Sequence, residues 1–427
     1  MNNKIKLAVA GAVLSAASAA NAGIIIPAGD WTLDIGGNVN AYANFSDTDK
    51  NTNTIVGGVA GATATGADDN DVTVTTGLLP NYLSVSGTTR QNDVDVGFTI
   101  SIQPGATTSQ SLIQVGQSNQ ENRQAFMTFG DKSWGSFKLG KDLGVFGSNA
   151  ILNDMTLLGV GGAHVNTNNT TTIGGIGTGY IYADWRAQVA YTTPNMNGFQ
   201  ATIAMMQPWN PQGATPAAIT GGDANNEGPT RNSHNNPGWE AQASYSWTGD
   251  IAGKVWVETM YEDMEDITNS GATLSATNSD NYSADAWGVG ASITSGNLGV
   301  VAYYYDADGV GTTGKFSNGL YNAGTNAAPN WKGRDSDGGY VQATYVIPTG
   351  TKLGVSYGVS NLDTGSGEAK NIALVESNKR WTVGAYHPLT KHLNLVAEYS
   401  DFKSETHATA QKDHESDVFS LGAILFF

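Results

Sequence analysis

Hydrophobic and polar residues alternate along most of the chain. In the segment 94–103, one parity holds Val94, Val96, Phe98, Ile100 and Ile102, and the other holds Asp, Gly, Thr, Ser and Gln. Successive side chains of a β-strand point to opposite faces, so a two-residue period over this length predicts a strand with one apolar and one polar face. The same period recurs in segments 33–45 and 419–427.

The pattern predicts about sixteen strands, an even number, as bacterial outer-membrane barrels have. The other strands are predicted at 79–89, 122–130, 135–141, 180–193, 198–207, 238–248, 253–262, 284–295, 298–307, 338–348, 351–361, 379–388 and 391–402. Short connections alternate with long ones rich in Asn, Gly and Thr. The short ones include 90–93, 131–134, 194–197, 296–297 and 348–350, and the long ones include 46–78, 104–121, 142–179 and 208–237. Short turns at one end and long loops at the other are typical of transmembrane barrels.

We therefore expect an all-β fold, a transmembrane antiparallel β-barrel of about 16 strands. A secreted β-sandwich also uses short alternating strands, but this length would require several domains, and no Pro-rich or charge-rich linker is present. Aromatic residues near segment ends suit the girdles of a membrane barrel; they are Trp31, Trp185, Tyr191, Trp247, Trp256, Trp287, Tyr303, Trp381 and Tyr399. With the apolar faces toward lipid, the polar faces would line a lumen wide enough for water.

The first 22 residues have the pattern of an export signal. Lys4 and Lys6 precede an uncharged run, 7–20, and Ala20-Asn21-Ala22 fits the small-x-small cleavage pattern. The run is too short and too rich in Ala and Ser for a transmembrane anchor. We therefore expect a cleaved signal peptide at 1–22 and a barrel domain at 23–427. No later stretch has 18 consecutive apolar residues, so a helical membrane protein is excluded.

Composition narrows the function. Only 14% of the residues are charged, whereas soluble domains have about 25%. The formal net charge of −17 makes nucleic-acid binding a poor interpretation, because phosphate contacts need clustered Lys and Arg. The absence of Cys excludes disulfides, thiolate metal sites and a Cys nucleophile. The excess of carboxylates predicts a modest preference for cations.

No motif for catalysis or for a cofactor stands out. The Gly-rich segment 174–179 lacks the following Lys-Ser/Thr of a phosphate-binding loop. Segment 47–51 begins like a calcium loop but lacks the Gly at position six and the Glu at position twelve. The six His residues have no metal-ligand spacing, and no nucleophile–base pair is visible. We expect no enzyme activity, no cofactor and no metal site.

Four stretches carry a family resemblance. They are 33–39; 122–127 with 135–141; 185–191 with 193–194 and 198–199; and the terminal Phe427 with its alternating hydrophobic residues. In this order and spacing the chain resembles the trimeric general porins of Gram-negative bacteria. The resemblance implies a channel in the outer membrane for passive diffusion of small hydrophilic solutes.

The resemblance also implies a pore constriction. In that family the third loop, here about 142–179, folds into the barrel and narrows it. Asp154 would be its acidic group, and Arg123 and Arg186, both on the inward parity, would form the basic wall opposite. Tyr82 stands where the family often has a basic residue, which weakens the transverse field. Lys138 has inward parity and would line the lumen.

The resemblance implies a homotrimer as well. Lys141 occupies a basic position of the family's hairpin that we assign to a subunit contact. On 122–129 the outward parity is expected to hold Gln124, Phe126 and Thr128, whose polar groups suit a subunit contact better than lipid. Phe427 resembles the signal read by the barrel-assembly machinery, and the trimer would sit among outer-membrane lipid and lipopolysaccharide.

Alternative functions remain at this stage. A channel selective for sugars, oligosaccharides or an anion would need an aromatic track or a ladder of basic residues. The low Lys and Arg content argues against an anion pore, whereas an inward member of Tyr303–Tyr305 would suit a sugar track. A structural or adhesive barrel and a barrel enzyme are the remaining alternatives.

Overall fold

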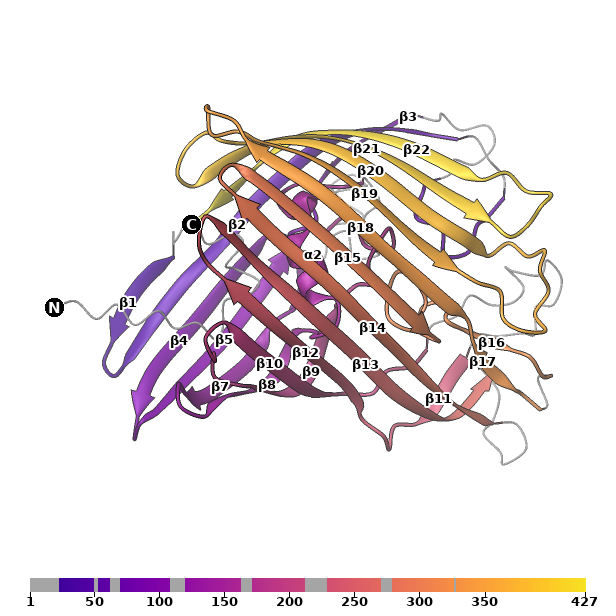
Figure 1. The fold of residues 1–427 in the computed structure, drawn as a ribbon, viewed down its shortest axis with the longest axis horizontal. Helices are drawn as coiled ribbons and strands as arrows, with labels where there is room; N and C mark the ends of the chain where they lie inside the picture. Colours follow the sequence, from indigo (N-terminus) through magenta and orange to yellow (C-terminus); the bar gives the residue numbers. More distant parts are fainter. Residues whose placement is uncertain are drawn as a thin grey trace, which may run out of the picture.

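The computed structural model describes residues 23–49, 53–61, 70–107, 120–162, 171–211, 229–269, 279–325 and 328–427. The predicted signal peptide, 1–22, lies outside the described residues. Across these ranges, sixteen antiparallel strands form a closed barrel in which each strand pairs with the next along the chain (Figure 1). The strands are β2 (Trp31–Thr48), β4 (Tyr82–Gln91), β5 (Val94–Pro104), β7 (Ala125–Asp131), β8 (Gly135–Leu143), β9 (Trp185–Thr192), β10 (Phe199–Met206), β12 (Gly238–Trp247), β13 (Ile251–Asn269), β14 (Asp280–Ser295), β15 (Leu298–Asp308), β18 (Asp335–Val346), β19 (Lys352–Leu362), β20 (Val375–Pro388), β21 (Leu393–Thr406) and β22 (His414–Phe426).

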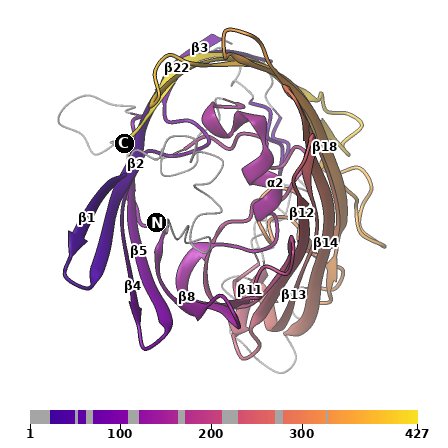
Figure 2. The same ribbon diagram turned by 60° about the vertical axis from the view of Figure 1, so that its left-hand side comes forward.

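The first and last strands close the barrel. β2 pairs with β22 through contacts such as Asn40 opposite Ile424. Phe427 extends this seam, because its backbone N–H donates to Gly37 O at 3.0 Å and its own carbonyl accepts from Gly37 N at 2.9 Å. Closure leaves no open edge of the sheet, which is how a barrel satisfies its backbone hydrogen bonds in lipid. Figure 2 shows the C-terminus beside β2 at this seam.

The alternating pattern predicts all sixteen barrel strands, and the barrel fold is confirmed. The pattern misses six short strands at the margins: β1 (Ile24–Ala28), β3 (Asn70–Thr75), β6 (Gln120–Glu121), β11 (Pro229–Ser233), β16 (Leu320–Asn322) and β17 (Trp331–Gly333). It also ends some strands too early. β13 continues from 262 to Asn269. Its last residues lose the two-residue period because the pairing register shifts between Met264 and Ile267, two apolar residues of opposite parity that are both buried.

The two faces of the barrel have opposite chemistry. Along β13, Val255 and Val257 are exposed on the outer face, whereas Trp256, Glu258 and Met260 are buried inside. Outer aromatic pairs include Trp287 with Tyr304 and Trp381 with Tyr399, as a girdle requires. The girdle prediction is wrong for Trp256 and Tyr303, which have inward parity and are buried. It is also wrong for Trp185, which packs against the buried cluster inside the barrel and lies under the Arg123 guanidinium.

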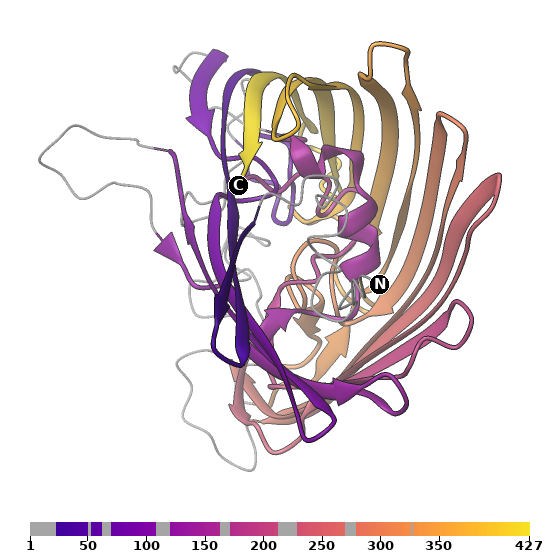
Figure 3. The same ribbon diagram turned by 90° about the vertical axis from the view of Figure 1, so that its left-hand side faces the viewer.

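Between β8 and β9, the described residues 144–162 and 171–184 lie inside the barrel, and we call them the lumen loop. It contains a short helix α2 (Ser148–Asn153) and a 3-10 turn η1 (Met155–Leu158). Figures 2 and 3 show α2 within the ring of strands. Apolar side chains of the loop, among them Phe146, Ile151 and Tyr180, share one buried cluster with Trp256 and Tyr340 of the wall. The largest buried cluster of the described residues thus fills part of the barrel interior.

Within the described ranges, no helix is both long and apolar enough to span a membrane.

Candidate pore constriction

Carboxylates of the barrel wall hold the lumen loop at its first residues. Glu240 on β12 accepts the backbone N–H groups of Val145 and Phe146 at 2.6 and 2.8 Å. Glu258 on β13 accepts the N–H of Gly147 at 2.9 Å. Carboxylates form short, strong hydrogen bonds to backbone N–H groups, so these contacts fix where the loop enters the lumen.

Other wall groups hold the middle of the loop. Tyr340 donates its hydroxyl hydrogen to Ala150 O at 2.8 Å. Gln342 Oε1 accepts the N–H of Met155 at 2.9 Å, and its Nε2 donates to Asn153 O at 2.6 Å. The loop is thus attached to β18 on the wall along α2 and η1, which gives the constriction a defined position.

Asp154 is part of this internal framework. Its Oδ1 accepts the backbone N–H of Thr156 at 2.9 Å and caps η1. Its Oδ2 accepts from Tyr180 Oη at 2.8 Å and lies 3.5 Å from Arg380 Nη2 on β20. The Asp154 and Arg380 side chains are both 1% exposed. Burial, with the negative charge of Asp154, raises the pKa of Tyr180 well above its usual value.

Arg380 is a partner of Asp154 that the sequence does not reveal, and the predicted role of Asp154 opposite the basic wall of Arg123 and Arg186 stays a prediction. The structure brings Asp154 to Arg380, not to Arg123 or Arg186, and buries the pair. Nothing in the alternating pattern of β20 distinguishes Arg380 except its inward parity. Its pairing with a loop residue 226 positions away depends on where the loop lies, which a strand pattern does not report.

Arg186 lies in a buried ion-pair network. Its guanidinium contacts Glu240 at 3.2 Å and Glu262 at 3.1 Å. Arg231 reaches Glu262 at 2.9 Å, and Lys315 reaches Glu240 at 2.6 Å. All five side chains are at most 1% exposed. The inward parity predicted for Arg186 is confirmed, but its guanidinium is enclosed by partners.

Lys315 joins a second connection to this network. It lies between β15 and β16, and its ammonium also donates to Ala183 O of the lumen loop at 2.7 Å. Burial lowers the pKa of Lys315, and the carboxylate of Glu240 opposes that shift. The network therefore connects the wall, the lumen loop and the connection after β15.

Arg123 stands just before β7 and faces the interior. Its Nε donates to Glu121 at 2.7 Å, and its guanidinium lies over the ring of Trp185, 5.6 Å from the centroid. Its backbone N–H donates to Gln103 Oε1 at 2.9 Å. Arg123 and Arg186 therefore occupy different settings, the first beside a cavity and the second inside a closed ion-pair network.

The remaining predicted lumen residues also lie inside the barrel. Tyr82 is buried among Leu78 and Leu79 and stands opposite Asn38 of β2. Lys138 has the predicted inward orientation, forms an ion pair with Asp142 and lies over the Phe126 ring at 5.1 Å. Their predicted role in the constriction stays a prediction.

The predicted outward orientation of Gln124, Phe126 and Thr128 is wrong. Phe126 pairs with inward-facing Thr99 and is 6% exposed. Gln124 accepts from Ser101 Oγ at 3.1 Å and donates to Asp142 at 3.0 Å. Residues 122–124 are not in a strand, so parity counted through them does not carry into β7. The outer face of β7 instead presents Ala125, Met127 and Phe129, which suits lipid or a neighbouring subunit.

Lys141 lies on the outer face, where its ammonium donates to Asn122 O at 3.0 Å. Its side chain is exposed, so its predicted subunit contact stays a prediction. The predicted role of Phe427 in assembly also stays a prediction.

Sequence patterns also miss the anchoring carboxylates Glu240 and Glu258, and with them Glu398 on β21, which accepts the N–H of Val160 in the lumen loop. Each is an acid at an inward position of its strand, and an inward acid is the only feature of the sequence that could have identified it.

The two inward tyrosines, Tyr303 and Tyr305, are at most 4% exposed. Tyr303 donates its hydroxyl hydrogen to Glu258 at 2.7 Å. Both rings belong to the buried cluster inside the barrel, which leaves neither open as part of an aromatic track for sugars.

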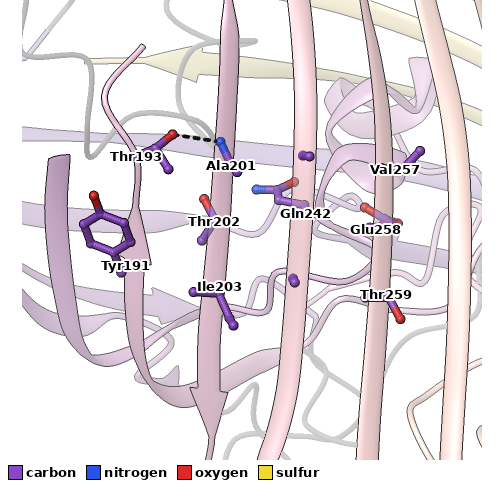
Figure 4. Close-up of a pocket in the computed structure, with 11 residues that line it drawn as sticks. Tyr191, Thr193, Ala201, Thr202, Ile203, Gln242, Val257, Glu258 and Thr259 are labelled. Atoms are coloured by element: carbon purple, nitrogen blue, oxygen red, sulfur yellow. Dashed lines mark hydrogen bonds between the residues drawn. The ribbon is translucent and has the colours of Figure 1, made fainter. Parts of the chain in front are cut away.

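An outward-facing hollow of about 550 Å³ lies over β9, β10, β12 and β13 (Figure 4). Small residues form its floor, notably Ala201, Ala241 and Ala243, and exposed Ile203 and Val257 flank them. This hollow faces away from the lumen, so it is not part of a solute path.

Among the described residues, no group of three or more His, Asp or Glu side chains is placed to hold a metal ion.

A closed barrel whose third long connection lies inside the lumen is the architecture of an outer-membrane channel. The family model described as Gram-negative porin matches residues 7–407, and the chain belongs to this family. It is accordingly a β-barrel protein of the outer membrane, in a family whose members are typically non-enzymatic channels. No curated protein sequence matches the chain.

Solved porin structures share the fold. The outer membrane channel DcaP of Acinetobacter baumannii is 15% identical, with a TM-score of 0.63 over 94% of this chain and 99% of that one. An anion-selective porin from Comamonas acidovorans is 12% identical, with a TM-score of 0.58 over 93% and 100%. Salmonella typhi OmpF, solved with daunomycin, is 16% identical, with a TM-score of 0.55 over 95% and 100%.

Proposed function

We propose that the mature chain, released from a signal peptide at 1–22, forms a water-filled channel for passive diffusion of small hydrophilic solutes and ions. The observation that carries this proposal is the lumen loop, held to the barrel wall from Val145 to Gly161. A loop attached at many points keeps one cross-section and requires no energy-driven movement. The channel has no catalytic role in this proposal.

The proposed ion preference is weak and favours cations. In the buried ion pairs, bases and acids are nearly matched, as in Arg186, Arg231 and Lys315 with Glu240 and Glu262. An unmatched acidic group lies instead at the long-loop ends of β14, β15 and β18. There Asp308 stands opposite Asp285 and Asp335, and Asp306 stands opposite Asp337. Asp285 and Asp306 share the outer parity of the exposed Trp287 and Tyr304, so the cluster lies on the outside of the rim. From there its field raises the cation concentration around the channel entrance at low ionic strength.

We further propose a homotrimer in outer-membrane lipid and lipopolysaccharide, inserted by the barrel-assembly machinery through Phe427. One structural neighbour, OmpT of Vibrio cholerae, is described in a trimer form, with a TM-score of 0.52 and 13% identity. The Comamonas porin is described as anion-selective, so the fold by itself does not imply a preference for cations and the charged residues must decide the sign.

Planar-bilayer recording of the detergent-extracted protein under a KCl gradient tests these statements together. We expect large ohmic steps in groups of three and a small cation-favouring reversal potential. An anion-favouring potential would overturn the ion preference, and single steps would overturn the trimer. A folded barrel that stays electrically silent would contradict the channel function and favour the structural or adhesive alternative.

A further inference from the structure

A cavity of about 280 Å³ lies inside the barrel, beside Arg123 and the lumen loop. One side of it is apolar and is lined by residues such as Leu79, Leu143 and Ile151. Another part is polar and is lined by Arg123, Asp184, Glu121 and Tyr182. An apolar wall joined to opposite charges is unusual for a lumen that passes only hydrophilic solutes.

Arg123 is held in place but keeps donors available. Glu121 binds its Nε at 2.7 Å, Trp185 covers its face, and the side chain is 5% exposed. Its two terminal nitrogens make no hydrogen bond to any residue in the described ranges. Neither nitrogen is among the fully buried atoms that lack a partner. Both are therefore open to the cavity. A fixed guanidinium with two free terminal nitrogens matches the geometry of a carboxylate.

Asp184 supplies the opposite charge. Its Oδ1 accepts the backbone N–H of Trp185 at 2.7 Å, and within the described part of the chain Oδ2 has no hydrogen-bond donor. The backbone of Asp184 adopts φ +58°, a left-handed conformation that is uncommon outside Gly. Tyr182, two residues earlier, accepts from Trp185 Nε1 at 2.8 Å, so its own hydroxyl hydrogen is available to donate.

The size of the cavity limits the ligand. Water occupies roughly 30 Å³ per molecule in the liquid, so about 280 Å³ corresponds to roughly nine water-sized groups. A ligand of that size must place a carboxylate at Arg123, a cation at Asp184 and an apolar body on the leucine and isoleucine side. A zwitterionic α-amino acid with a branched aliphatic side chain meets all three requirements.

We propose that this cavity is a binding site for small apolar α-amino acids on their way through the channel. The proposal rests on the proposed channel function and adds a substrate class to it. Binding at such a site holds the solute in the narrow region and reduces the ion current while it is occupied. A hydrophilic amino acid of similar charge lacks the apolar contacts and should pass without this effect.

The test is channel recording in KCl with L-leucine, glycine, 4-methylpentanoate and 3-methylbutylamine as separate probes. We expect L-leucine to reduce the current in a saturable manner and to need at least tenfold higher concentrations in Arg123→Gln and in Asp184→Asn. The carboxylate alone and the amine alone should each be at least tenfold weaker than leucine. Lys379→Gln, on the outer face of β20 and paired with Glu405, should respond like the wild type.

The outcomes separate the two proposals. An intact KCl conductance that leucine and glycine affect equally rejects the binding site and keeps the channel. Equal potency of 4-methylpentanoate and leucine rejects the role of Asp184 and the zwitterion class. No conductance from a folded barrel rejects the channel itself. Arg123→Gln removes a partner of Glu121. If that variant fails to fold, Asp184→Asn, at a half-buried residue, tests the site.

Discussion

Glu398 on β21 accepts the backbone N–H of Val160 in the lumen loop at 2.7 Å, although the two residues are 238 positions apart. The same oxygen accepts the N–H of Gly161 at 2.9 Å, and the other oxygen accepts from Tyr386 Oη at 2.6 Å. The approach is so close that a Cβ on Gly159 would stand 2.0 Å from the Glu398 carboxylate. One wall carboxylate thus determines where the chain turns after η1.

Glu398→Ala should therefore loosen the lumen loop. The substitution removes the acceptor of two buried N–H groups, and each unsatisfied group costs about 1–3 kcal/mol. We expect greater open-channel current noise and a changed single-channel conductance, measured in planar bilayers. Glu376→Ala is the matched control because Glu376 is an exposed acid on β20. Gly159→Ala should reproduce the Glu398→Ala behaviour, and quiet wild-type traces from both variants would show that this contact does not position the loop.

Arg186→Gln should destabilise the barrel strongly. It leaves the buried carboxylates of Glu240 and Glu262 with one cation fewer, and breaking a buried ion pair costs about 3–5 kcal/mol. The free energy of unfolding, followed by Trp fluorescence in denaturant, is the measurement. Arg90→Gln is the control, since Arg90 is 44% exposed where it meets Asp95 and Asp131, and exposed pairs contribute about 0–1 kcal/mol. Equal losses in the two variants would contradict the buried network.

The barrel is readable from the sequence because membrane strands must alternate. Lipid requires an apolar residue at every second position, and the lumen accepts polar ones, so the pattern marks each spanning strand. It fails where that requirement ends. Beyond residue 262, β13 shifts its register between Met264 and Ile267, and β11, which pairs with this end of β13, has no apolar face. Parity also fails across 122–124, which lie outside any strand before β7 begins at Ala125.

The site is less readable because its contacts join distant segments. Inward parity places Glu240, Glu398 and Arg380 in the lumen, but it does not say which of them meets the loop. Asp154 is identified as a charged loop residue, yet its partner depends on how η1 lies against β20. Lys315 comes from another connection, whose strands β16 and β17 are three residues each, too short for a periodic pattern.

Asp154 and Arg380 should behave as a coupled pair. Either Asp154→Asn or Arg380→Gln leaves one buried charge unpaired, whereas the double variant removes both charges. Residues in one hydrogen-bond network show interaction energies of about 0.5–3 kcal/mol. We expect the double variant to lose less stability than the sum of the single variants, measured as the free energy of unfolding. Strict additivity would indicate that the 3.5 Å contact contributes nothing measurable.

The acidic group on the outside of the rim should contribute to the cation preference through its long-range field. Asp285, Asp306 and Asp335 are exposed, so their field acts through water and is screened over about 30 Å at 0.01 M salt and about 3 Å at 1 M. In the triple variant with all three changed to Asn, the reversal potential under a KCl gradient should move toward zero in dilute salt and differ little from wild type in concentrated salt. Asp250→Asn, at the short turn between β12 and β13, is the control because it removes an acid from the opposite end of the barrel. An unchanged potential in the triple variant at low salt would assign the preference to charges deeper in the lumen, and an effect that persists at 1 M would exclude a screened surface field as its cause.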